Sequence, residues 1–95
     1  MITAFVLVNA VADRIPEAAQ EIADIDGVDE VYSCSGEVDL VVLVRVAEHA
    51  DLAALIPGRI GKVDGVLNTD THIAFRSYSR RDAEESFSIG SDDAG

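Results

Sequence analysis

Apolar and polar residues alternate along this chain with two different periods, and the changes of period predict an order of strands and helices. Four segments show β-branched runs or apolar residues at every second position, which is typical of strands. Two others show apolar residues at helical spacing. The predicted strands are residues 2–8, 28–35, 38–46 and 66–75, and the predicted helices lie within residues 13–25 and 52–63, with Asp13 as the expected cap of the first helix.

The two halves of this pattern resemble each other. The segment Ile22–Val28 (IADIDGV) matches the segment Ile60–Val66 (IGKVDGV) at an offset of 38 residues, and each carries an Asp-Gly pair where a helix should end. The chain therefore has the order β-α-β-β-α-β. This order predicts a ferredoxin-like α+β fold, with a four-stranded antiparallel sheet and two helices on one face, connected by right-handed crossovers.

Pro57-Gly58 interrupts the second predicted helix. A proline inside a helix removes a hydrogen-bond donor and clashes with the carbonyl four residues earlier, which costs ~3 kcal/mol or more. We expect a break at Ile56-Pro57 that divides this helix into two short pieces.

The predicted sheet has apolar residues on both of its faces, although two helices can cover only one of them. On the uncovered face, large exposed apolar patches usually mark a contact with a partner. The alternative is a slightly apolar monomer surface. We predict that two copies pair sheet to sheet through Phe5, Leu7, Val41 and Leu43.

The length of 95 residues allows one domain, predicted over residues 1–78, followed by an acidic, serine-rich tail over residues 79–95 that is expected to be disordered. Eighteen acidic residues against seven basic ones give a net charge of −11, and Lys62 is the only lysine. Nucleic-acid binding requires Lys and Arg to neutralise phosphates, so direct binding is not expected. The chain has no apolar stretch of membrane-spanning length and no secretory signal, so it is expected to be cytoplasmic.

The residue types that carry metal or covalent chemistry are few and scattered. Cys34 is the only cysteine and is expected to be a buried or half-buried structural thiol. His49 and His72 are far apart in sequence and have no further ligands at metal-binding spacing, so no metal site is predicted. No nucleophile-base pair or phosphate-binding loop is present, and neither an enzymatic activity nor a cofactor is expected.

The segment Val31–Val44 (VYSCSGEVDLVVLV) resembles the Ser/Thr-Gly-x-x-Asp element of the Lrp/AsnC ligand-binding domain, also called the RAM domain. The flanking helices and the last strand extend the resemblance over residues 1–76. In that family the domain is the effector half of a transcription factor and follows a helix-turn-helix domain. Nothing precedes the first strand here, so the resemblance implies a stand-alone regulatory form that does not bind DNA itself. It also implies homodimers that assemble into octamer-like rings and a possible association with a full-length paralogue.

The resemblance implies that the effector, an amino acid, binds at the hairpin loop where dimers meet. Asp39 would hold its ammonium and the turn at Gly36 would donate N–H groups to its carboxylate. Alternatively, Gly36 only shapes the turn and Asp39 pairs with Arg45 or with an arginine of a partner. Glu37, where many relatives carry an uncharged or aromatic residue, adds a second anion that would suit a basic effector. The predicted ligand-binding residues are Gly36, Asp39, Ser35, Glu37, Thr69 and Thr71.

Two other functions fit the same topology. One is a dimeric α+β-barrel enzyme of the cofactor-free monooxygenase type, for which His72 and Tyr32 are the available side chains. The other is an oligomerisation module without a ligand. Thermal stabilisation by amino acids, measured together with the assembly state, separates these functions from effector binding.

Overall fold

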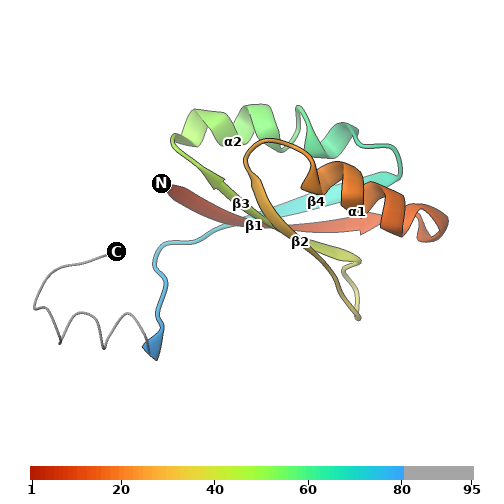
Figure 1. The fold of residues 1–95 in the computed structure, drawn as a ribbon, viewed down its shortest axis with the longest axis horizontal. Coiled ribbons are helices and arrows are strands. Elements are labelled where there is room, and N and C mark those ends of the chain that lie inside the picture. The colour runs from red at the N-terminus through yellow and green to blue at the C-terminus, as the bar shows by residue number, and fades with distance from the viewer. Residues whose placement is uncertain (81–95) are drawn as a thin grey trace, which may run out of the picture.

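The computed structural model describes residues 1–80, and in it two helices cover one face of a four-stranded antiparallel sheet (Figure 1). The sheet order is β2-β3-β1-β4, which confirms the predicted ferredoxin-like α+β fold. The predicted tail, residues 79–95, lies outside the described residues apart from Ser79 and Arg80. The elements are β1 (Ile2–Ala10), η1 (Ala12–Arg14), α1 (Ile15–Ala23), β2 (Val28–Ser33), β3 (Leu40–Val46), α2 (His49–Leu55), η2 (Ile60–Lys62) and β4 (Val66–Ile73).

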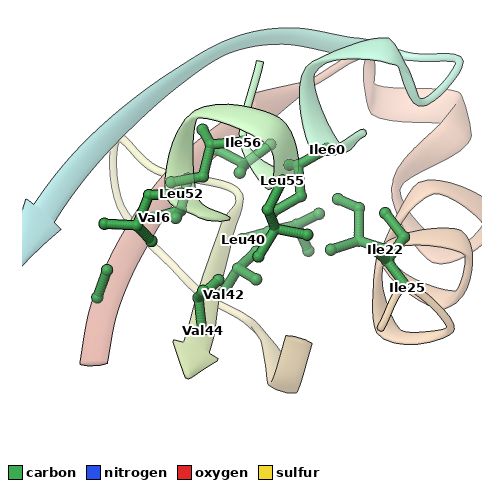
Figure 2. Packing of buried hydrophobic residues seen from close by; sticks show 12 residues of the cluster. Val6, Ile22, Ile25, Leu40, Val42, Val44, Leu52, Leu55, Ile56 and Ile60 are labelled. Carbon is green, nitrogen blue, oxygen red and sulfur yellow. The ribbon is translucent and has the colours of Figure 1, made fainter. Parts of the chain in front are cut away.

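The core lies between the sheet and the helices. Alternate residues of β1 and β3 point toward the helices and are fully buried, as period-2 alternation requires. They pack against Ile22 of α1 and Ile60 of η2, which are also fully buried and occupy matching positions in the two halves of the chain (Figure 2). The fully buried strand residues are Ala4, Val6, Val8, Leu40, Val42 and Val44.

The break predicted in the second helix is confirmed. Helix α2 ends at Leu55, and the chain turns before the short η2 begins at Ile60. A Cβ atom at Gly58 would lie 2.2 Å from the backbone oxygen of Ala54, so this turn requires glycine. Both Leu55 and Ile56 remain buried, because the break changes the direction of the chain without removing it from the core.

Two local predictions were wrong. Asp13 does not cap a helix, because it lies within η1 and no side chain caps the N-terminus of either η1 or α1. Helix α1 begins with proline in its first turn, where the missing N–H has no intrahelical partner to lose. The strands that flank the hairpin loop are also shorter than predicted, because β2 ends at Ser33 and β3 begins at Leu40.

Candidate functional site

The loop between β2 and β3, residues 34–39, carries the Gly-x-x-Asp element. Its ends are joined by a hydrogen bond of 3.0 Å from the Cys34 N–H to the Asp39 carbonyl. Gly36 has φ +100°, a conformation that side chains other than glycine rarely adopt, while a Cβ there would meet nothing within 4 Å. Gly36 is therefore needed for the backbone conformation, and the space around the turn is open to a ligand.

Asp39 connects this loop to the end of β1. Its Oδ2 accepts a hydrogen bond of 2.9 Å from the Ala10 N–H and one of 3.4 Å from the side-chain amide of Asn9. Its own N–H donates to the Val8 carbonyl at 3.1 Å. The alternative pairing of Asp39 with Arg45 is wrong, because Arg45 lies at the far end of β3 and its Nε is 3.6 Å from a carboxylate oxygen of Asp29.

Asn9 was not predicted from the sequence, although its side chain connects both sides of the loop. Besides its bond to Asp39, its amide donates to the Glu37 carbonyl at 2.7 Å. The available signal was a polar residue at the end of an otherwise apolar strand. Its significance depends on the antiparallel register, in which Val8 pairs with Leu40 and the next residues, Asn9 and Asp39, come together.

Asp39→Ala is expected to lower the free energy of unfolding by about 1.5–3 kcal/mol, the usual contribution of hydrogen bonds to a charged group. The substitution leaves the N–H of buried Ala10 without its partner. Asp39→Asn keeps an oxygen in the same place and should cost less than half as much. Urea unfolding of both variants measures the difference, and equal losses would contradict a specific role for the Ala10 bond.

The two threonines predicted to bind the ligand lie on the other face of the sheet. Thr69 pairs with Val8 and Thr71 with Val6, so both point to the side that the helices cover. Within one chain they do not line the same surface as Asn9 and the Asp39 carboxylate. Ser35 and Glu37 are exposed in the loop itself. A site that includes both the loop and the threonines would therefore need a second copy of the chain.

The uncovered face of the sheet carries the predicted apolar cluster, Phe5, Leu7, Val41 and Leu43. Phe5 pairs with Leu43 and Leu7 with Val41, which places the four side chains together on neighbouring strands. Phe5 is 41% exposed, and the other three are half-buried. This cluster has no covering element within residues 1–80.

Tyr32 of β2 borders the apolar cluster, because it pairs with Val41. Its hydroxyl donates a hydrogen bond to the Glu30 carboxylate, which raises the pKa of Tyr32 above its ordinary value. Cys34 is exposed in the single chain, so the expectation of a buried thiol was wrong. The strand that was predicted to include Cys34 ends at Ser33, one residue before it.

The histidines lie apart from the loop and from each other. His72 is exposed on β4 and its Nε2 is 3.1 Å from Asp70, while His49 is the first residue of α2. In the part of the chain that the structure describes, no three side chains of metal-ligand type come together. No helix among residues 1–80 is long and apolar enough to cross a membrane.

Comparison with known proteins identifies the family. Residues 3–84 match the Lrp/AsnC ligand binding domain. The crystal structure of TTHA0845 from Thermus thermophilus is 41% identical, with a TM-score of 0.79, and the match covers 84% of this chain and 100% of that one. The feast or famine regulatory protein Rv3291c from M. tuberculosis, complexed with L-methionine, is 32% identical with a TM-score of 0.70, over 85% of this chain and 55% of that one.

Among curated proteins, the uncharacterized HTH-type transcriptional regulator YugG of Bacillus subtilis is 32% identical over 77 residues, which are 81% of this chain and 45% of YugG. The chain spans about half the length of the curated relatives it matches. These matches decide against the monooxygenase alternative, because the family is one of regulatory ligand-binding domains. They do not distinguish effector binding from a ligand-free oligomerisation module.

Proposed function

We propose that this chain binds an amino acid at the loop 34–39, at a contact between copies of itself. The premise is that the chain belongs to the Lrp/AsnC ligand-binding domain family. The observation that carries the proposal is the Gly36–Asp39 turn. It joins an open glycine turn to a carboxylate that two hydrogen bonds hold in place. A ligand would then act by changing how copies of the chain associate.

The chemistry of the loop suits the two charged groups of an amino acid. Oδ2 of Asp39 is occupied by Ala10 and Asn9, but its Oδ1 accepts no hydrogen bond from residues 1–80 and is available to an ammonium. The N–H groups around Gly36 are available to a carboxylate, as in other anion-binding turns. The related protein Rv3291c, complexed with L-methionine, supports an amino acid as the class of ligand.

Assembly through the uncovered sheet face is the second part of the proposal. Packing the cluster Phe5, Leu7, Val41 and Leu43 against a second copy would bury these four side chains, and the octamer-like ring would join such dimers near the loops. Thr69 and Thr71 would then contribute to the site from a neighbouring copy. The net charge of −11 opposes direct DNA binding, so any effect on transcription would pass through a DNA-binding paralogue that shares this face.

Asp39→Asn is expected to weaken amino-acid binding by about tenfold, because the ammonium loses a charged acceptor. The full chain is first screened by thermal shift against the twenty amino acids, with light scattering to follow assembly, and the best ligand is then titrated by calorimetry. Asp13→Asn is the matched control, because Asp13 is exposed and its carboxylate forms no hydrogen bond or ion pair among residues 1–80.

Two outcomes would contradict this proposal. Unchanged affinity in Asp39→Asn would dismiss the role of the carboxylate. Assembly of the unsubstituted chain with no response to any amino acid would instead favour a ligand-free oligomerisation module.

A further inference from the structure

A second candidate site lies at the other end of the β2–β3 hairpin from the loop 34–39. A cavity of about 400 Å³ opens there between the α1–β2 turn and α2, within the usual size range of small-molecule sites. Buried Leu55 and half-buried Val46 supply its apolar surface. Its charged lining residues are all exposed and include two of each sign: Asp26, Asp51, Arg45 and Arg59. Along the strands, six residues separate the two sites, roughly 20 Å at the rise of a β-strand.

Gly27 and Arg59 shape this cavity. Gly27 has φ +98°, and a Cβ at this position would lie 3.1 Å from Leu55 Cδ2, inside the space beside the apolar surface. Arg59 lies one turn beyond Leu55, because its N–H donates to the Leu55 carbonyl at 3.0 Å as in an α-helix, and it also lines the cavity.

The Asp26-Gly27 turn beside this cavity has a counterpart 38 residues later, and an arginine side chain lies against that counterpart. At the matching Asp64-Gly65 turn, the side chain of Arg14 occupies the space. Its Nε is 3.6 Å from the Asp64 carboxylate, one NH₂ group donates to the Asp64 carbonyl at 3.2 Å, and the same group donates to Glu21 at 2.9 Å. The hydrogen bond to Glu21 and the nearby charge of Asp64 raise the pKa of Arg14 above its ordinary value. This Asp-Gly turn is therefore covered by a guanidinium on an alkyl stem.

At the Asp26-Gly27 turn, no cation stands at the position that corresponds to Arg14. Arg45 also lines the cavity, but its Nε is 3.6 Å from a carboxylate oxygen of Asp29. Leu52 replaces Arg14 at the corresponding position and is buried in the core, while Arg59 replaces the acidic Glu21. Within residues 1–80, neither the Asp26 carboxylate nor the Arg59 guanidinium forms a hydrogen bond or an ion pair. A molecule that satisfies both groups must carry a cation and an anion.

We propose that this cavity is a second small-molecule site, which takes a zwitterion with a guanidinium or ammonium group, an alkyl stem and a carboxylate. The cationic group pairs with Asp26 as Arg14 pairs with Asp64, the stem lies on Leu55, and the carboxylate pairs with Arg59. The acidic surface of the protein favours the approach of the cationic group. This site goes beyond the proposed function and does not depend on the loop 34–39.

Nuclear magnetic resonance titration of the full chain tests the proposal with L-arginine as the probe. Saturable shifts are expected at the amides of Gly27, Val46 and Leu55. L-Citrulline keeps the α-ammonium but replaces the side-chain guanidinium by a neutral urea, and agmatine lacks the carboxylate. Each should therefore bind about tenfold more weakly, the usual loss for one charge-assisted contact. Unmoved amides, or equal affinity for the three compounds, would overturn the proposal.

Substitutions then locate the site. Ala54→Phe places a ring in the cavity and is expected to abolish the shifts, whereas Ala53→Phe, on the same helix but outside the cavity, is the matched control. Asp26→Asn and Arg59→Gln should each weaken L-arginine binding about tenfold for the same reason. L-Arginine binding that survives Ala54→Phe would refute the site. A ligand at the loop 34–39 would instead shift the amides of those residues, so failure of this site and failure of the proposed function are distinguishable in the same titration.

Discussion

Gly58→Ala is expected to lower the free energy of unfolding by about 3 kcal/mol, the upper part of the range for forcing atoms into a packed site. The added Cβ would lie 2.2 Å from the Ala54 oxygen and 3.2 Å from the Ala54 carbonyl carbon. Both are backbone atoms of α2, so the strain cannot be relieved by rotating a side chain. The turn itself would have to move, and with it the buried Leu55 and Ile56.

Urea unfolding of the purified chain measures this loss, and Gly61→Ala provides a matched control in the same segment. Its Cβ would lie 3.3 Å from the Ile56 oxygen, a contact that a shift of a few tenths of an ångström removes. We expect less than about 1 kcal/mol for the control. Equal losses for the two variants would contradict the close approach of Gly58 to the Ala54 oxygen.

Leu43→Glu is expected to convert the assembled protein to a monomer, with the dimer dissociation constant raised by about 100-fold or more. The reason is the cost of burying a carboxylate without a partner in an apolar contact. Leu43 lies beside Phe5 on the uncovered face, and its other neighbour across the strands is the acidic Glu30. A glutamate at this position would therefore meet an apolar ring on one side and a like charge on the other.

Sedimentation and light scattering across a range of protein concentrations measure the effect. Leu67→Glu is the matched control, because it makes the same exchange at a 63% exposed leucine on the edge strand β4, outside the apolar cluster. Leu43→Glu should retain the thermal stability of a folded chain while losing assembly. If Leu43→Glu assembles as well as the unsubstituted protein, the uncovered face is not the interface.

Loss of assembly in Leu43→Glu would also inform the ligand proposals. A site built from the loop 34–39 of one copy and Thr69 or Thr71 of another disappears when copies separate. The Asp26–Arg59 cavity lies within a single chain and should persist in the monomer. Titrating one monomeric variant with both kinds of ligand would therefore separate an inter-subunit site from an intramolecular one.

Several features of the fold were predictable because they depend on local sequence. The alternation of apolar residues in β1 and β3 matches the buried face, since period-2 alternation is a property of any extended strand. The Asp-Gly pairs mark both helix-to-strand turns, where Gly27 and Gly65 each have φ +98°. The break at Pro57 follows from the missing donor and the ring. None of these depends on residues that are distant in sequence.

The candidate sites were less predictable, because their contacts join distant segments. The bond from Ala10 to Asp39 spans 29 residues and exists only in the register that opposes Val8 and Leu40. The same register places Thr69 and Thr71 on the helix-covered face, which the pattern of β4 did not reveal because its residues are mostly polar on both faces. The loop as a ligand site stays a prediction, and the internal role of Asp39 was not part of it.

The sequence alone determined the βαββαβ order, the repeated half, the covered face of the sheet and the resemblance to a ligand-binding family. Each of these follows from periodicity and turn chemistry within short segments. Only the tertiary structure decided that Asp39 stabilises the end of β1, that the threonines lie on the other face, and that one Asp-Gly turn holds Arg14 while the other borders a cavity. The physical reason is that strand register and helix packing, which no short segment specifies, determine which charged groups meet.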